Sequence, residues 1–243
     1  MKSLTKIIGE LTLAGALLLG CGEYIGRALD DRNASLAVSS SARNPIRETK
    51  PFPSYTSVDY TNATINQKIQ QGRFEPGFLE EVESLCQILD MNCMGLLSVI
   101  DYETRGTFHP YIRNKGTFPS SVKKSSIKTR RSTATGLIQF TQATAEALGT
   151  TTESLAFMSQ HQQIPYLARY FAQHRKAQTD YSNPDDIALT IFHPASVGQG
   201  SDHVIARRGR RSYHQNARLD NSPQDGRITA REYVQEALNR GYL

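Results

Sequence analysis

A carboxylate at the end of an apolar run, followed about thirty residues later by a Gly-containing polar turn, is the part of this sequence best suited to chemistry. Residues 96–106 read LLSVIDYETRG, and residues 134–140 read ATGLIQF. A carboxyl group at the mouth of a buried helix can have a raised pKa and serve as a proton donor. Cleavage of a glycosidic bond requires such a donor, and Glu103 is our candidate for it.

Other features near Glu103 favour this interpretation over the commoner alternative, in which a Glu at a helix end is only a solvated charge. The helix before it is otherwise apolar, so one side of the carboxylate should face a low-dielectric wall. Gly106 permits the close approach of backbone or substrate. The segment from Gly136 to Phe140 supplies an amide, in Gln139, and an aromatic ring, which suit hydrogen bonding to a sugar and stacking on it.

The elements that would position these residues are predicted to be helices. Apolar residues recur at helical spacing from Phe78 to Leu89, and a break at residues 90–92 precedes a second, buried helix over about 93–102. Further helix starts are indicated by Thr141, by the capping-box pairs Ser159/Gln162 and Thr229/Glu232, and by the sequence NPDD at 183–186. The last helix should end near Gly241. No run of alternating residues indicates a strand, so the domain is predicted to be mainly α.

The N-terminus indicates export. Residues 1–6 are a short basic start, residues 11–19 are apolar except for Thr12, and Cys21 follows Leu-Leu-Gly. This ending resembles the lipobox of bacterial lipoproteins, in which the cysteine is acylated; an uncleaved signal anchor is the alternative. We therefore expect an export signal at 1–21 and a flexible, disordered tether at 22–70, rich in Ser, Asn, Arg, Pro and Thr. The folded domain is expected at 71–243.

Bulk composition narrows the partners without selecting one. At 243 residues and 38% hydrophobic, the chain can bury one core but hardly two. Its net charge of +5 suits a polyanionic partner or merely a soluble basic surface. Nucleic acid is not expected as a partner, because the chain is predicted to be exported and carries no recognisable binding module.

Two motifs resemble a known family. The segment ETRGTFHP at 103–110 resembles the Glu-Ser-Gly-Gly-x-Phe-x-Pro signature of the soluble lytic transglycosylases, and ATGLIQF resembles their Ala-x-Gly-Leu-Met/Ile-Gln turn. The phage-associated muramidases are the most similar subset. The segments LAFMS at 155–159, Tyr170-Phe171, and the stretch from Tyr213 to Thr229 follow that subset in order, so the likeness covers roughly residues 78–243.

The resemblance implies a lysozyme-like helical fold that binds peptidoglycan glycan strands. It implies that Glu103 is the single general acid and base, that Gln139 contacts the saccharide, and that Thr104 replaces the family's usual Ser. Thr104, Gly136, Gln139 and Phe140 are thus the expected substrate-binding residues. The family's Ala-Tyr-Asn segment is replaced here by TIFHP at 190–194, and Tyr213 is the candidate for the missing tyrosine.

A single acid implies a particular reaction. Glycosidases usually use two carboxylates, and Asp101 should project from another side of the helix than Glu103. The resemblance implies the activity of a lytic transglycosylase, which cleaves the MurNAc–GlcNAc β-1,4 bond and leaves 1,6-anhydro-MurNAc ends, and the lack of an obvious second acid agrees with it. A hydrolytic muramidase of the same fold and a non-catalytic peptidoglycan-binding lipoprotein are the alternatives. The enzyme is expected to be a monomer without metal or cofactor, lipid-anchored through Cys21 on the periplasmic side of the cell envelope, at the outer membrane if one is present.

Three further patterns each allow two interpretations. Cys86 and Cys93 form either a disulfide across a turn or a pair of small apolar fillers. Residues 221–232 have the length of a calcium loop, but we favour a turn with a helix cap. The basic residues of two stretches either grip acidic wall groups or form solvated faces: Arg113, Lys115, Lys123, Lys124, Lys128, Arg130 and Arg131, and Arg207, Arg208, Arg210 and Arg211.

Overall fold

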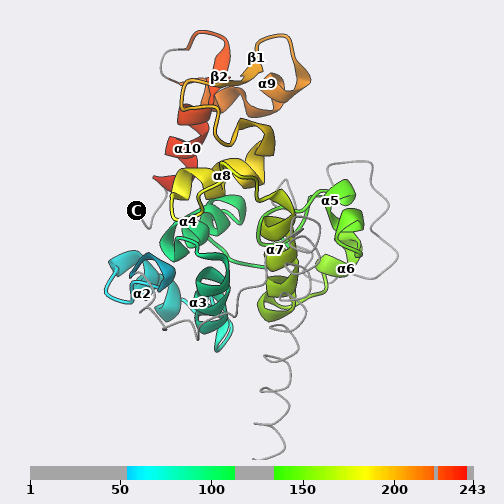
Figure 1. Ribbon diagram of the computed structural model, residues 1–243. Coiled ribbons are helices and arrows are strands. Elements are labelled where there is room, and N and C mark those ends of the chain that lie inside the picture. Colours follow the sequence, from blue (N-terminus) through cyan, green and yellow to red (C-terminus); the bar gives the residue numbers. More distant parts are fainter. Residues whose placement is uncertain (1–53, 113–133, 222–223, 240–243) are drawn as a thin grey trace, which may run out of the picture. The chain divides into compact units, whose positions relative to one another are not determined.

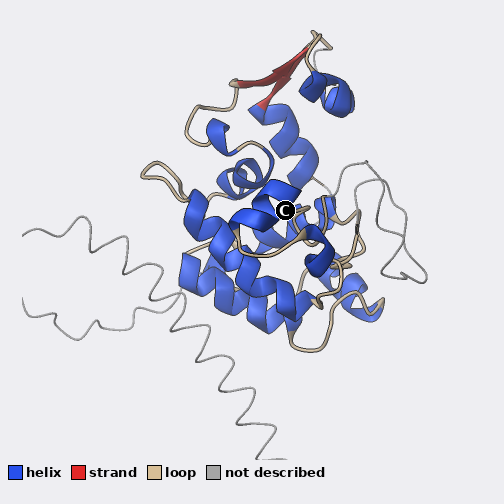
Figure 2. Cartoon of the chain, turned by 90° about the vertical axis from the view of Figure 1, so that its right-hand side faces the viewer, coloured by secondary structure: helices blue, strands red, loops and turns tan. Residues whose placement is uncertain are grey.

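A computed structural model of the chain describes residues 54–112, 134–221 and 224–239. All of them belong to one compact unit that spans residues 52–243. The export signal, Cys21, most of the predicted tether and the basic residues 113–131 lie outside the described residues. The described part is mainly helical, as predicted (Figures 1 and 2). None of its helices is long and apolar enough to cross a membrane.

Two consecutive helices, α3 (Phe78–Leu89) and α4 (Cys93–Glu103), form the centre of the unit. Asp90 ends α3 in a left-handed conformation with φ of 47°, and the Asn92 side chain caps α4 by accepting from the N–H of Gly95 over 2.8 Å. The predicted break between the helices is therefore confirmed. Helix α4 is buried along its length, and Leu96, Leu97, Val99 and Ile100 have no exposed area.

Three later helices pack around this pair (Figure 1). Helix α7 (Gln160–His174) contacts α3, while α8 (Pro184–Phe192) and α10 (Ala230–Leu238) contact α4 and each other. Gly95 lets α4 and α8 approach closely, because a Cβ there would lie 2.7 Å from the Cβ of Pro184. The capping boxes at Ser159/Gln162 and Thr229/Glu232 are both formed, as predicted. Capping residues that can be recognised in the local sequence therefore determine where these core helices begin.

Shorter elements complete the unit: η1 (Ser54–Thr56), α2 (Ala63–Gln70), α5 (Gln142–Ala147), α6 (Thr152–Leu155), η2 (Pro194–Ser196), β1 (Val204–Arg207), α9 (Arg211–Asn216), η3 (Ala217–Leu219) and β2 (Arg227–Thr229). Strands β1 and β2 pair antiparallel, with Val204 opposite Thr229 and Arg207 opposite Arg227 (Figure 2). The sequence did not indicate these two strands, because four and three residues are too few to show an alternating pattern. We call residues 204–229 the C-terminal lobe.

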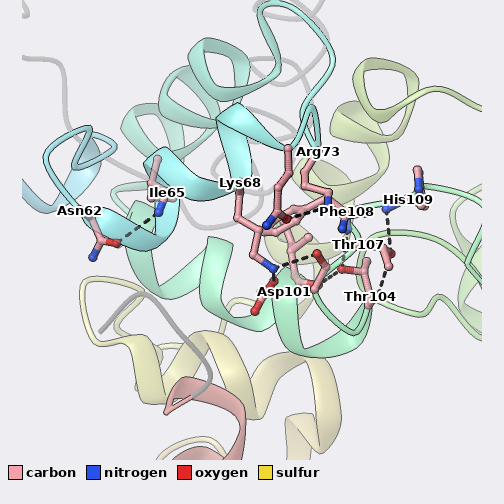
Figure 3. A network of polar contacts seen from close by, with 12 residues as sticks. Asn62, Ile65, Lys68, Arg73, Asp101, Thr104, Thr107, Phe108 and His109 are labelled. Atoms are coloured by element: carbon pink, nitrogen blue, oxygen red, sulfur yellow. Dashed lines mark hydrogen bonds and ion pairs between the residues drawn. The ribbon is translucent and has the colours of Figure 1, made fainter.

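Helical order begins before the predicted domain boundary at residue 71. Asn62 caps α2 by accepting from two backbone N–H groups, and Ile65 is fully buried. At the end of α2, the Lys68 ammonium donates to Asp101 on α4 and to the carbonyl oxygen of Gly106, each over 2.9 Å (Figure 3). Residues 54–70 are thus part of the domain rather than of the tether. Their polar composition, with one deeply buried apolar residue in α2, hid this in the sequence.

Candidate active site at the end of helix α4

Glu103 is the last residue of α4 and is only partly exposed. Its Oε1 accepts a hydrogen bond from the hydroxyl of Tyr233 on α10 over 3.3 Å. Burial raises the pKa of Glu103 to about 7, and this effect outweighs the Tyr233 hydrogen bond and the positive charge of Arg218, which both lower it. A carboxyl group with this pKa is partly protonated at neutral pH, as a general acid must be.

Aromatic side chains supply the low-dielectric surroundings of Glu103. The ring of Tyr233 stacks on Phe192 at 3.9 Å and meets Tyr102 edge-on at 6.0 Å. The hydroxyl of Tyr170 donates to the carbonyl oxygen of Thr190 over 2.7 Å. Burial raises the pKa of both Tyr170 and Tyr233, and the charge of Glu103 adds to it in each case. These phenols therefore stay neutral and act as hydrogen-bonding walls rather than as acids.

Arg218, from η3 of the C-terminal lobe, brings a positive charge to the same place. Its guanidinium donates to the hydroxyl of Tyr102 over 2.6 Å and to the carboxylate of Glu236 over 2.9 Å. The side chain is 58% exposed, so part of the guanidinium faces solvent. Glu236 is therefore a second carboxylate in this region, and Arg218 neutralises it.

Asp101, the acid closest to Glu103 in sequence, is held by other groups. Its carboxylate accepts from Lys68 over 2.9 Å, and the residue is 5% exposed. This ion pair joins α2 to α4 (Figure 3). Its position agrees with the expectation that Asp101 projects from another side of the helix.

Thr104 has a role different from the expected contact with a saccharide. It is fully buried; its hydroxyl donates to the carbonyl oxygen of Ile100 over 2.6 Å and accepts from the N–H of Phe108 over 3.0 Å (Figure 3). Arg105 and Phe108 each have a φ of 55°, which is unfavourable for residues with a Cβ. The Thr104 hydroxyl thus stabilises the loop after Glu103 and has no surface for substrate.

The second motif folds into a closed turn. Thr135 and Phe140 exchange two backbone hydrogen bonds, of 3.0 and 2.8 Å, around it. Within the turn the Gln139 amide donates to the carbonyl oxygens of Ile112 and Gly136 over 3.1 and 3.0 Å. Gln139 is partly exposed, and its Oε1 has no hydrogen-bond partner among the described residues. Contact between Gln139 and a saccharide stays a prediction, with this oxygen as the available acceptor.

Three other expected substrate-binding residues lie in the interior. Phe140 is 2% exposed and packs edge-on against Tyr170 at 6.1 Å, so it supports a wall of the site instead of stacking on a sugar. Gly136 is buried beneath α7. Tyr213 lies inside the C-terminal lobe, where its hydroxyl donates to Asp220 over 2.5 Å. The structure therefore corrects these three assignments, because none of the side chains or backbone sites has a surface for substrate.

The tyrosine that contacts Glu103 is Tyr233, which the sequence analysis missed. The capping box at Thr229/Glu232 predicted its helix but not the direction of its faces. Ala230, Tyr233 and Ala237 recur at helical spacing and are buried, and this spacing was the available signal.

Two buried glutamines of α7, also missed, hold the two motif loops together. Gln163 accepts from the N–H of Leu137 over 2.9 Å and donates to the carbonyl oxygens of Pro110 and Leu155 over 2.7 and 2.9 Å. Gln160 donates to the carbonyl oxygen of Phe108 over 2.8 Å. Side-chain hydrogen bonds from one helix thereby fix both the loop after Glu103 and the turn of Gln139.

The contact between Gly136 and Gln163 gives a prediction about stability. Gly136 has a φ of 93°, and a Cβ there would lie 2.6 Å from Oε1 of Gln163. We expect Gly136→Ala to lower the free energy of unfolding by roughly 3 kcal/mol, from backbone strain and overpacking. Gly149→Ala is the matched control, because its φ is 75° but nothing lies within 4 Å of the added Cβ. Equal losses in chemical denaturation would contradict the role of the close contact.

The loop at residues 221–232 is organised by hydrogen bonds. The carboxylate of Asp220 accepts from the N–H groups of Asp225 and Gly226 over 3.0 and 2.9 Å, and that of Glu232 accepts from the N–H of Thr229 over 2.8 Å. The predicted helix cap is confirmed. Among the described residues, no group of three or more His, Cys, Asp or Glu side chains is arranged to hold a metal ion.

Cys86 and Cys93 are both buried, free thiols on α3 and α4. The Cys93 thiol donates to the carbonyl oxygen of Thr56 over 3.3 Å. Burial raises the pKa of the Cys86 thiol. The structure therefore agrees with the interpretation of this pair as small apolar fillers and not as a disulfide.

A hollow of about 700 Å³ lies on another side of α10. Its lining includes Asp185, Leu189, Val234 and Leu238 but not Glu103. Tyr233 and Val234 are neighbours on α10, so this helix stands between the hollow and the candidate site. The hollow is therefore separate from the candidate site.

Comparisons of the chain with models of protein families, with curated proteins and with solved structures gave no match. The geometry around Glu103 and the two motifs therefore carry what can be inferred about the function of the protein.

Proposed function

We propose that the protein is a peptidoglycan lytic transglycosylase with a lysozyme-like fold. The observation that carries the proposal is Glu103 itself: a carboxyl group with a pKa of about 7, at the end of a buried helix and hydrogen-bonded to Tyr233. The likeness of its loop and of the Gln139 turn to the transglycosylase motifs adds the substrate class. The α7 glutamines bring support of another kind, because they tie those two motif loops to one helix.

In the proposed reaction the protonated Glu103 gives its proton to the glycosidic oxygen between MurNAc and GlcNAc. The bond from MurNAc C1 to that oxygen breaks, and the GlcNAc hydroxyl leaves. The C6 hydroxyl of the same MurNAc then attacks C1 and loses its proton to the Glu103 carboxylate. The product is a 1,6-anhydro end, no water is consumed, and Glu103 returns to its protonated form.

Glu236 gives the hydrolytic alternative a specific basis. A muramidase that adds water needs a second carboxylate near the sugar, and Glu236 is bonded to Arg218, which contacts Tyr102 next to Glu103. The proposal favours the transglycosylase because this carboxylate is already neutralised by an arginine.

Mass spectrometry of the muropeptides released by the full-length protein tests the proposal. Anhydro ends, lighter by one water than reducing ends, are expected from the wild type and from Glu236→Gln alike. Reducing ends together with loss of activity in Glu236→Gln would establish the muramidase instead. Binding to peptidoglycan without any released product would favour the non-catalytic wall-binding protein.

The pH dependence of cleavage gives a further prediction. Because Glu103 must be protonated in the first step, kcat/KM should fall about tenfold per pH unit above a midpoint near 7. Tyr233→Phe removes a hydrogen bond that favours the charged carboxylate, so the midpoint should move to higher pH. Tyr181→Phe is the control, since the Tyr181 hydroxyl bonds the carbonyl oxygen of Phe171. Identical midpoints in all three proteins would contradict the assigned contact.

The remaining parts of the proposal concern location. The protein acts as a monomer on glycan strands in the cell envelope, on the periplasmic side, and is anchored to the membrane by acylated Cys21, at the outer membrane if one is present. The signal-like sequence of residues 1–21 supports this.

A further inference from the structure

The C-terminal lobe contains four exposed arginines within a stretch of five residues. They are Arg207 at the end of β1, Arg208, Arg210, and Arg211 at the start of α9, and we call residues 207–211 the arginine turn. None of the four forms an ion pair within the described part of the chain.

The other arginines in or next to this lobe differ from these four. Arg218 pairs with Glu236 over 2.9 Å, Arg227 with Asp225, and Arg231 with Asp202 over 2.7 Å. Seven arginines therefore divide into three that are neutralised by an acid and four that are not. The uncompensated positive charge of the lobe is concentrated in the arginine turn.

Hydrogen bonds fix the backbone of the turn, and further contacts place the side chain of Arg208. The N–H of Arg208 donates to the carbonyl oxygen of Gly226 over 2.7 Å, and the N–H of Arg210 to that of Arg207 over 3.1 Å. The Arg208 side chain lies against Gly226, where an added Cβ would be 3.3 Å from its Cβ and its Nε. Its guanidinium lies 6.0 Å from the centre of the Tyr213 ring. Ordering of this kind reduces the conformational entropy that a charged side chain loses when it binds an anion.

The ligand must carry several anionic groups that match arginine. Guanidinium forks bind planar carboxylates through paired hydrogen bonds. The lobe is also connected to the candidate site, because Arg218 of η3, which follows α9 directly, bonds Tyr102 beside Glu103. The glycan substrate itself carries anions that would reach this position, namely the carboxylates of its attached peptides.

We propose that the arginine turn binds the carboxylates of the acidic peptides attached to the glycan strand, and so anchors the strand beside Glu103. This inference rests on the proposed function, since it takes peptidoglycan as the substrate. It assigns a peptide-binding role to a lobe whose interior, including Tyr213 and Asp220, makes no contact with Glu103 in the structure.

Binding of soluble glycan strands to the full-length protein tests the inference, with strands from one preparation used before and after an amidase removes their peptides. All proteins carry Glu103→Gln so that strands are not cleaved. The protein with Glu103→Gln alone is the parent. At physiological ionic strength, the added change Arg210→Gln/Arg211→Gln should weaken binding to peptide-bearing strands roughly tenfold relative to this parent and leave binding to peptide-free strands unchanged.

The matched control is Arg227→Gln/Arg231→Gln, which removes the same formal charge from the same region but leaves the arginine turn intact. It should bind both kinds of strand as the parent does. Equal weakening by the two double variants would reduce the effect to net charge and overturn the inference. So would equal weakening of the turn variant on both kinds of strand, or no binding of the parent to peptide-bearing strands.

The outcomes also separate this inference from the proposed function. A wild-type protein that binds peptide-bearing strands through the turn but releases no product would refute the transglycosylase and leave the peptide site standing. Competition by phosphatidylglycerol vesicles, with binding indifferent to peptide removal, would assign the turn to lipid phosphates and overturn the inference.

Discussion

Replacing Glu103 with glutamine is expected to reduce the release of soluble muropeptides from peptidoglycan by roughly 10²- to 10⁴-fold, the usual contribution of a general acid or base. Glutamine keeps the size and the hydrogen-bond acceptor that Tyr233 contacts, but it has no proton to donate to the glycosidic oxygen. The proposed mechanism uses Glu103 twice, as acid and then as base, so the substitution removes both proton transfers.

Glu80→Gln is the matched control for that loss, since Glu80 is exposed in the first turn of α3. It should release muropeptides at the wild-type rate. Digestion that persists undiminished in Glu103→Gln would remove Glu103 from the catalytic role and end the proposal in its present form.

Glu103→Gln should also make the folded protein more stable at alkaline pH. The pKa of Glu103 is about 7 in the folded state and 4.5 without burial, so between these values the folded state binds more protons than the unfolded one. Stability is therefore lost as the pH rises through this window. Glu103→Gln should increase the free energy of unfolding by about 1–3 kcal/mol at pH 8 and leave it unchanged at pH 4. A variant that is inactive but more stable has lost chemistry and not structure.

Helix starts were the part of the fold that the sequence predicted best, because they depend on neighbouring residues. Asn92, Ser159, Asn183 and Thr229 each cap a helix where their side chains can reach backbone N–H groups two or three residues away. Segments with weak local signals were missed. Helix α2 buries Ile65 and is fixed to α4 by Lys68, which is a contact between distant segments.

The candidate site shows the same division. Glu103 was identified because an acid that ends an apolar helix is visible in the sequence itself. Tyr213 was the candidate tyrosine and Tyr233 was missed, because only tertiary packing places Tyr233 against Glu103 and Tyr213 inside the C-terminal lobe. Thr104 and Phe140 belong to motifs, but a motif does not say which of its members supports the loop and which remains exposed.

Gln163→Leu should be the most destabilising of the substitutions considered. Leucine fills a similar volume, but the N–H of Leu137 and the carbonyl oxygens of Pro110 and Leu155 would lose their partner. Gln163 has no exposed area, so water cannot replace these bonds without rearrangement. At about 1–3 kcal/mol for each unsatisfied buried group, we expect a loss of about 3–5 kcal/mol in the free energy of unfolding. That is a large part of the roughly 5–15 kcal/mol typical of a domain.

Gln173→Leu is the matched control, because it makes the same exchange on an exposed position of the same helix. Urea denaturation should separate the two variants clearly, with Gln173→Leu within about 0.5 kcal/mol of the wild type. If Gln163→Leu does not fold, the local unfolding of the wild-type protein gives the same information. It is measured by amide hydrogen exchange. The N–H of Leu137 should then exchange as slowly as the core of α4. Fast exchange at Leu137, or equal stability of the two variants, would show that Gln163 does not hold the Gln139 turn against the loop after Glu103.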